Sequence, residues 1–307
     1  MKMIFAGQGP FGEKVLKRLQ QNREDVRAVF CPQGRAGEAI KGLAEDAGFT
    51  LYQPDHLKDP KVLETFRRIE PDLVILAFVT DILPEALLDA PGLGTICYHP
   101  SLLPRHRGAS AINWAIIQGD TRTGLTVLWA DTGIDTGPIL LQKEVPIDPQ
   151  DTTGSLYFQK LFPLGVEAML EAVELIKQGR APRQVQDEAQ ASYEPPCDDR
   201  VAGIEWSKPG QTVYNLVRGC DPQPGAYSFC RGRKVRFYGA HFVSETLDRP
   251  PGEILDVRPE GLRVSLPDGM LHVGKMRGTD TGKLEAFAFA QEAQLQAGMR
   301  FGDPEDF

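Results

Sequence analysis

Short apolar segments alternate with amphipathic helical patterns through the first half of the chain. This alternation is typical of βαβ units, in which a helix carries the chain back to begin the next parallel strand. It predicts an α/β fold with a mostly parallel sheet. The expected strands are Met3–Ala6, Val26–Phe30, Leu73–Ala77, Thr95–His99 and Leu125–Ala130. The expected helices are Gly12–Gln20, Ser110–Gln118 and Gly154–Gln178.

Polar residues interrupt this pattern between positions 185 and 200, where two prolines and five acidic residues predict a linker. Beyond it, short apolar runs separated by proline and glycine turns indicate a smaller β-rich, barrel-like domain. We therefore expect a first domain over residues 1–203, including a linker at about 185–203, and a second domain over residues 204–307. The expected strands of the second domain are Val235–Tyr238, Glu253–Val257, Leu262–Leu266 and Leu271–Lys275.

Composition disfavours several classes of partner. The chain has a net charge of −8, whereas proteins that bind a nucleic-acid backbone usually present a basic face. The longest apolar run, Leu73–Val79, has seven residues, against about 20 for a membrane span. The five cysteines include no Cys-x-x-Cys pair, and the histidines lack metal-ligand spacing. We therefore expect a cytoplasmic protein with no metal, no membrane and no nucleic acid as partners, and the oligomeric state stays open.

A glycine loop follows the first expected strand. Gly7-Gln8-Gly9-Pro10-Phe11-Gly12 satisfies the G-x-G-x-x-G pattern of dinucleotide sites. However, the second strand ends in Val29-Phe30-Cys31-Pro32, without the acidic residue that would hold a ribose. Pro10 also removes a backbone N–H that a pyrophosphate would use. The loop therefore favours a tight strand-to-helix turn over a nicotinamide site.

One histidine stands at the end of an expected strand, where open parallel sheets bind their ligands. His99 closes the strand Thr95–His99 and precedes Pro100, which forces an extended exit. The turn that follows is polar and rigid, and it is costly to build without a ligand. The residues that make it polar and rigid are Ser101, Pro104, Arg105, His106, Arg107 and Gly108. We take His99 as a candidate catalytic residue.

A second loop follows the next expected strand and contains two Asp-Thr-Gly triplets, which begin at Asp131 and Asp135. If this strand is a neighbour of the strand ending in His99, the loop can deliver Asp135 beside His99. Aspartic proteases also use this triplet, but they take one copy from each lobe. Two copies four residues apart on one loop cannot form that facing pair. We expect Asp131 to cap the loop through its turn chemistry.

The string Tyr98–Trp114 reads Tyr-His-Pro-Ser-Leu-Leu-Pro-Arg-His-Arg-Gly-Ala-Ser-Ala-Ile-Asn-Trp, and it resembles the folate-dependent formyltransferase family. Further matching stretches lie at residues 129–131, 140–144, 181–183 and 224–226. The similarity extends over nearly the whole chain. It is strongest toward the N-terminal hydrolase portion of 10-formyltetrahydrofolate dehydrogenase, and methionyl-tRNA formyltransferase is a related enzyme.

The resemblance implies a Rossmann-like domain that handles the formyl group, followed by a domain related to the C-terminal domain of methionyl-tRNA formyltransferase. It also implies 10-formyltetrahydrofolate as the small-molecule substrate and formyl donor, with no role for NAD(P) in this chain. By position, His99 and Asp135 match the family's catalytic pair. The folate-contacting residues that match in the same way are Ser101, Leu102, Leu103 and Pro104 in the turn, and Asp81, Ile82 and Leu83 in the segment that lines the pterin pocket.

Cys97 departs from the family pattern, because most transferases carry asparagine two residues before the catalytic histidine. An amide aimed at a developing oxyanion contributes about 10²–10³ in rate, so its absence favours water as the acceptor or a slower transfer. Cys97 is also a poor candidate nucleophile. Side chains at i and i+2 of a strand lie about 6–7 Å apart, beyond the ~3 Å reach of His99 as its base.

Three residues of the turn are assigned supporting roles. Arg105 and Arg107 have two interpretations that the sequence leaves open: contact with the glutamate tail of a folate, or a solvated turn with an internal ion pair. His106 stands between them.

The site chemistry and the resemblance together favour hydrolysis of 10-formyltetrahydrofolate to tetrahydrofolate and formate. The first alternative is transfer of the formyl group to a small amine or a sugar amine, and methionyl-tRNA ranks below these because the chain is acidic. An alternative of another class is a non-catalytic module that binds folate or a nicotinamide.

Overall fold

The computed structural model describes residues 1–302, and the chain divides into two compact units. The first unit comprises Met1–Gly108, Gly124–Val145 and Phe158–Tyr193. The second comprises Ala109–Thr123, Pro146–Tyr157 and the chain from Glu194 onward. A single boundary at residue 203 stays a prediction, and positions 303–307 of the expected second domain lie outside the described residues.

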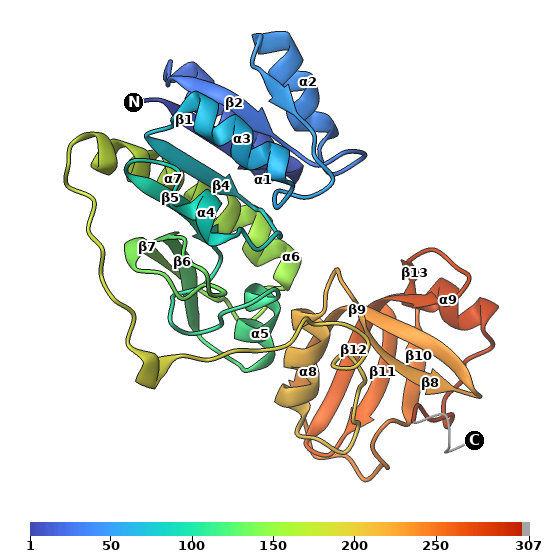
Figure 1. Cartoon of the computed structure of the whole chain (residues 1–307). Helices are drawn as coiled ribbons and strands as arrows, with labels where there is room; N and C mark the ends of the chain where they lie inside the picture. The colour runs from blue at the N-terminus through green and yellow to red at the C-terminus, as the bar shows by residue number, and fades with distance from the viewer. Residues whose placement is uncertain (303–307) are drawn as a thin grey trace. The chain divides into compact units, whose positions relative to one another are not determined.

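A seven-stranded sheet forms the centre of the first unit (Figure 1). Its order is β3-β2-β1-β4-β5-β6-β7, and the five strands from β3 to β5 are parallel to their neighbours. β6 is antiparallel to β5. This confirms the predicted α/β fold with a mostly parallel sheet. The strands are β1 Met3–Gly7, β2 Val26–Phe30, β3 Leu51–Tyr52, β4 Leu73–Ala77, β5 Gly94–His99, β6 Arg122–Trp129 and β7 Ile139–Pro146.

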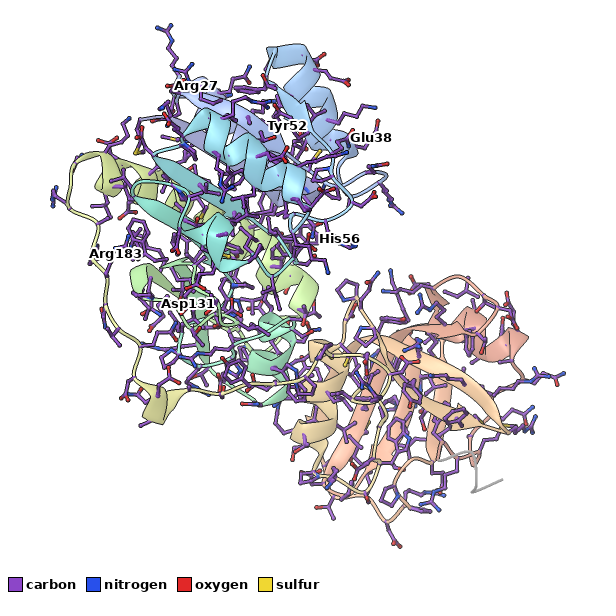
Figure 2. The ribbon with its side chains drawn as sticks, in the orientation of Figure 1. Arg27, Glu38, Tyr52, His56, Asp131 and Arg183 are labelled. Atoms are coloured by element: carbon purple, nitrogen blue, oxygen red, sulfur yellow. The ribbon has the colours of Figure 1, made fainter. Side chains whose placement is uncertain are left out.

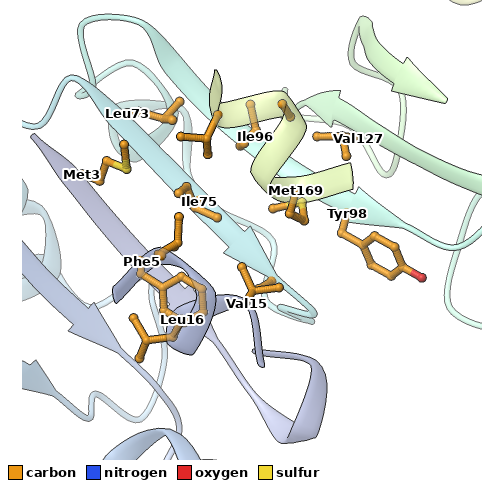
Figure 3. Packing of buried hydrophobic residues seen from close by; sticks show 14 of the residues in the cluster. Met3, Phe5, Val15, Leu16, Leu73, Ile75, Ile96, Tyr98, Val127 and Met169 are labelled. Atoms are coloured by element: carbon orange, nitrogen blue, oxygen red, sulfur yellow. The ribbon is translucent and has the colours of Figure 1, made fainter. Parts of the chain in front are cut away.

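Helices cover the sheet on both sides, which explains why its central strands are apolar at every position. Because strand side chains alternate, Met3 and Phe5 enter one apolar cluster, whereas Ile4 and Ala6 enter another. Figure 3 shows the first cluster, where strand residues meet Val15 and Leu16 of α1 and Met169 of α7. The helices of this unit are α1 Gly9–Gln21, α2 Glu38–Ala47, α3 Pro60–Ile69, α4 Glu85–Leu88 and α7 Phe162–Lys177.

The long helix expected over Gly154–Gln178 is divided into pieces. A short α6, Thr153–Ser155, leads into a π-helical turn over Leu156–Leu161, and α7 begins only at Phe162. Proline occupies the beginning of α7, where its missing N–H is tolerated but would break a helix interior. The apolar periodicity was therefore sufficient to predict helix but not its irregular start.

A six-stranded antiparallel sheet dominates the second unit, in the order β10-β11-β12-β9-β8, with β13 paired to β12. The C-terminal segment joins the two edges of this path, because Gly302 bridges Phe229 of β8 and Arg300 bridges Glu253 beside β10. The predicted β-rich, barrel-like domain is thus confirmed. Its strands are β8 Ala226–Cys230, β9 Arg233–Ser244, β10 Ile254–Arg258, β11 Gly261–Leu266, β12 Gly269–Gly278 and β13 Leu284–Glu285. Its helices include α5 Ala111–Ile117, α8 Gly210–Gly219 and α9 Ala286–Glu292.

Candidate active site

His99 lies at the carboxyl end of β5 and is 5% exposed. Its imidazole is held at both nitrogens. Nε2 is 2.7 Å from the carbonyl oxygen of His106, and Nδ1 is 3.3 Å from Oδ2 of Asp135. A carbonyl oxygen only accepts hydrogen bonds, so Nε2 carries a proton and donates it to His106. The expectation that Asp135 lies beside His99 is confirmed.

The strand that precedes Asp135 is not parallel to the strand that ends in His99. β5 and β6 are antiparallel, with Ile96 opposite Trp129 and His99 opposite Thr126. The loop after β6 therefore starts at the far end of β5 and returns toward His99. Asp135 has a φ of 57° in this loop. The N–H of Gly108 donates to its Oδ2 at 2.8 Å, which fixes the carboxylate from a second direction.

Asp131, in the first Asp-Thr-Gly triplet, is an exposed residue of the same loop (Figure 2). Its Oδ1 accepts the N–H of Gly133 at 3.1 Å and the hydroxyl of Thr136 at 2.7 Å. These are the hydrogen bonds of a turn-forming aspartate. The expectation that Asp131 caps the loop is confirmed.

Burial dominates the electrostatics of the pair. It lowers the pKa of His99 from its ordinary 6.5, and this effect exceeds the opposing effects of the Asp135 carboxylate and the His106 carbonyl, which raise the pKa. Burial also raises the pKa of the neighbouring Cys97 thiol to about 12, with a smaller contribution from the charge of Asp135. Cys97 is therefore a neutral thiol at physiological pH. It packs on Leu103, Leu128 and Ile139, which suits a wall of a pocket and not a nucleophile.

Many polar groups of the turn after His99 form hydrogen bonds within the protein. Ser101 Oγ donates to the carbonyl of Arg105 at 2.6 Å, and Thr126 Oγ1 donates to the carbonyl of Ser101 at 2.7 Å. The Nε2 of Gln142 donates to the carbonyl of Leu103 at 2.9 Å. The side chains of Ser101 and Leu103 are buried, whereas Leu102 and Pro104 are partly exposed. These hydrogen bonds hold the turn rigid beside His99.

The segment Asp81–Leu83 lies at another part of the sheet edge. Oδ2 of Asp81 accepts the N–H of Leu57 at 2.9 Å, while Ile82 is 63% exposed and Leu83 is buried. Asp81 and His56 line a cavity of about 180 Å³ together with Gly7 and Gln8. Figure 2 labels His56. His99 and Asp135 are not among the residues that line this cavity. A pterin contact for Asp81–Leu83 stays a prediction.

The two arginines of the turn have different environments. Arg107 is 2% exposed, and its guanidinium contacts Glu188 at 2.6 Å and Oε1 of Gln186 at 2.8 Å. Of the two interpretations left open, the internal ion pair is therefore the one observed for Arg107. Arg105 is exposed. His106 is buried, and its N–H donates to Ser192 Oγ at 2.8 Å.

Residues 184–193, which we call the strap, are the part of the site that the sequence did not indicate. The expected linker begins at about residue 185, yet the strap packs along both loops of the site. Gln184 forms a β-bridge with Ile139, and Tyr193 forms one with Arg107. The hydroxyl of Tyr193 also donates to the carbonyl of Ile134 at 3.0 Å. One sequence signal could have indicated that the strap is ordered. Flexible linkers are rich in glycine and serine, whereas the strap contains the amide-rich run Gln-Val-Gln-Asp-Glu-Ala-Gln.

The glycine loop after β1 is explained by close packing. A Cβ on Gly7 would lie 2.7 Å from the Phe5 ring and 3.0 Å from the carbonyl of Ala77. Gly9 has a φ of 62°, a conformation that side chains disfavour. These two positions require glycine for the strand-to-helix turn itself.

Residues 1–302 contain neither a metal-binding cluster nor a membrane-spanning helix. No cluster of three or more histidine, cysteine, aspartate or glutamate side chains is arranged to bind a metal ion there. No helix in that part of the chain has both the length and the apolar character that a membrane crossing needs.

Comparison with known proteins identifies the family. The formyl transferase family profile matches residues 1–173, and the profile of the formyl transferase C-terminal domain matches residues 198–294. The chain belongs to the formyl transferase family. It is therefore an enzyme of that family.

Two relatives illustrate the range of the family. Mitochondrial 10-formyltetrahydrofolate dehydrogenase of Mus musculus is 41% identical over 265 residues, which cover 84% of this chain but only 28% of the dehydrogenase. Methionyl-tRNA formyltransferase of Syntrophus aciditrophicus (strain SB) is 35% identical over 310 residues, covering 98% of this chain and 99% of the relative. Among solved structures, HypX from Aquifex aeolicus in complex with tetrahydrofolic acid shares the fold, with a TM-score of 0.69, 23% identity, and coverage of 95% of this chain and 47% of HypX.

Proposed function

We propose that this chain takes 10-formyltetrahydrofolate as its formyl donor and hydrolyses it to tetrahydrofolate and formate. The observation that carries the proposal is the buried contact of 3.3 Å between His99 Nδ1 and Asp135 Oδ2. The family supplies formyl transfer as the class of reaction, and the 41% identical dehydrogenase is named for this folate.

In the proposed mechanism, Asp135 accepts a proton from the attacking water. Its Oδ2 already receives the N–H of Gly108 and faces His99. Within residues 1–302, no hydrogen-bond donor reaches Oδ1, and the side chain is 17% exposed. Oδ1 is therefore the oxygen that water can approach. Attack on the formyl carbon gives a tetrahedral intermediate with negative charge on the formyl oxygen.

His99 stabilises that charge and then protonates the leaving group. Its Nε2–H is committed to the carbonyl of His106, so Nδ1, which faces Asp135, is the nitrogen proposed to act on the substrate. When Nδ1 is protonated, it donates to the oxyanion and delivers its proton to N10 as the carbon–nitrogen bond breaks. The products are tetrahydrofolate and formic acid, which releases its remaining proton to solvent as formate, and the proton taken up by Asp135 returns to His99.

Cys97 is the residue that favours water over an amine as the acceptor. Its thiol is neutral and lies against apolar side chains of the turn and of β6. This wall offers only a weak donor to the oxyanion, where an asparagine amide would contribute about 10²–10³ in rate. A small acceptor that is present at high concentration tolerates this loss better than a dilute amine does.

The folate is proposed to bind along the turn Ser101–Pro104, whose backbone is fixed by Thr126 and Gln142. The segment Asp81–Leu83 is proposed to contact the pterin. We also propose a cytoplasmic location. All five cysteines are free thiols in the structure, which suits a reducing compartment.

Transfer to an amine is the second candidate, because the match to methionyl-tRNA formyltransferase covers 98% of this chain and 99% of the relative. Under this alternative the same His99 and Asp135 act on an amine nucleophile. The net charge of −8 favours a small amine or a sugar amine over an aminoacyl-tRNA.

The acceptor is decided by following both products in one experiment. Pure protein is incubated with 10-formyltetrahydrofolate alone, with a panel of amines and amino sugars, and with methionyl-tRNA. We expect formate release at a rate that no acceptor changes. Formylated product that accumulates at the expense of formate would establish a transferase, and the absence of both products would contradict the proposed donor.

A further inference from the structure

The side chain of Gln186 forms four hydrogen bonds inside the protein. It is 6% exposed. Its Oε1 accepts from Nε and Nη2 of Arg107 at 3.2 and 2.8 Å, and its Nε2 donates to the carbonyls of Asp135 and Gly137, both at 2.8 Å. A glutamine amide has one accepting oxygen and two N–H donors. All of these groups are hydrogen-bonded to two loops of the site, which are the turn after β5 and the loop after β6.

Each partner of Gln186 belongs to a support of the catalytic pair. Arg107 lies between His106, whose carbonyl holds His99 Nε2, and Gly108, whose N–H holds Asp135 Oδ2. On the other side, the amide bonds directly to the carbonyl of Asp135. Gln186 therefore connects the turn that fixes His99 with the loop that fixes Asp135.

The pattern of donors and acceptors selects an amide over a carboxylate at this position. A glutamate would suit the Arg107 guanidinium, which already pairs with the exposed Glu188. It would, however, turn an accepting oxygen toward the two loop carbonyls, which need donors. Stability of the buried arginine alone would favour glutamate, whereas the Asp135 loop requires glutamine.

We propose that Gln186 is a positioning residue, which holds Asp135 and His99 at their reactive separation by joining the loops that carry them. This inference rests on the proposed function of that pair. Gln186 does not touch the turn Ser101–Pro104 in any described contact, so its effect is expected in kcat and not in the KM for the folate.

The test compares Gln186→Glu and Gln186→Met with Gln184→Glu. Gln184 pairs with Ile139 of β7 through its backbone alone, and its side chain is exposed with no described contact to either loop, so its variant matches the chemical change outside the Gln186 hydrogen bonds. For both Gln186 variants we expect kcat to fall by about 10²-fold, as for a displacement of about 1 Å at a reacting group, with KM nearly unchanged. Thermal unfolding and circular dichroism identify any variant that fails to fold, and two variants of different chemistry guard against that outcome.

A histidine NMR titration supplies a readout that does not depend on turnover. The described groups that act electrostatically on His99 are Asp135 and His106, and Asp135 raises its pKa. Gln186→Met adds no charge, so displacement of Asp135 would lower the pKa of His99, whereas Gln184→Glu would leave it unchanged. His99→Gln assigns the resonance.

The outcomes separate the two proposals. Folded Gln186 variants with the kcat and the His99 pKa of the unaltered protein would overturn the positioning role. If the unaltered protein neither releases formate nor transfers a formyl group, the proposed function fails. The titration then still supports or overturns the role of Gln186 as the residue that holds Asp135 against His99.

Discussion

The loop after β1 and the turn after β5 leave strands of the same sheet, but they bury different groups. The glycine loop brings Gly7 against the Phe5 ring and the carbonyl of Ala77, so its sequence is explained by shape. The turn after β5 buries an imidazole and a guanidinium, which are costly to remove from water and need dedicated partners. The comparison teaches that a motif explained by packing carries little functional information, whereas a buried polar cluster held by several loops indicates chemistry.

The largest expected effect distinguishes the two Asp-Thr-Gly triplets. Asp135→Asn removes the carboxylate that faces His99, and we expect turnover of 10-formyltetrahydrofolate to fall by about 10²–10⁴-fold. Asp131→Asn is the matched control, because an asparagine oxygen can still accept from Gly133 and Thr136. Steady-state kinetics of the two variants measures the difference. Equal losses in both would remove the distinction between a catalytic and a turn-forming aspartate.

The pH dependence sharpens the role of the buried histidine. Burial lowers the pKa of His99 from 6.5, so the protonated ring that the mechanism uses is lost as the pH rises through a value below 6.5. We expect kcat to increase as the pH falls from about 8 to about 6, approaching tenfold per unit. Asp135 and His106 are the groups that act on the ring, and Asp135→Asn should move the profile to lower pH. A kcat that increases with pH would contradict proton donation by His99.

The glycine loop should respond in stability and not in catalysis. Gly7→Ala places a Cβ 2.7 Å from the Phe5 ring, and we expect it to reduce the free energy of unfolding by about 1–3 kcal/mol. Gly9→Ala meets no atom within 4 Å and retains only the strain of its positive φ, about 1 kcal/mol. Chemical denaturation measures both. A loss of kcat per folded molecule in Gly7→Ala, without loss of stability, would give this loop a functional role.

The smallest expected effect is the response to nicotinamide dinucleotides. The loop has the glycines of a dinucleotide fingerprint but lacks its acidic partner at the end of β2. Calorimetric titration with NAD⁺ and NADPH is therefore expected to show no binding. Saturable binding that Gly7→Ala abolishes would reverse the comparison between the two loops.

The fold was predictable where side chains alternate or repeat. The strands at Val26–Phe30 and Leu73–Ala77 were found with their observed bounds, because an apolar run between turn signals leaves little choice. β3 has only two residues, too few for an alternating pattern to be visible. β7 includes the exposed residues Gln142 and Glu144, so it lacks the continuous apolar run that indicated the other strands. The antiparallel direction of β6 depends on the tertiary path of the chain and leaves no trace in its sequence.

The site was predictable as far as its residues lie at strand ends. His99 and Asp135 stood out by position, and their contact follows from the pairing of β5 with β6. Gln186 did not stand out, because its role depends on bonds to residues 49, 51 and 79 positions away. Long-range hydrogen bonds of a polar segment cannot be distinguished from the solvation of a linker by composition alone.

The most direct test of the central claim is the turnover of 10-formyltetrahydrofolate by His99→Gln, with formate and formylated product summed. The account predicts a rate about 10²–10⁴-fold below that of the unaltered protein, at similar thermal stability. A folded His99→Gln variant with a rate close to that of the unaltered protein would contradict the assignment of formyl chemistry to this buried pair.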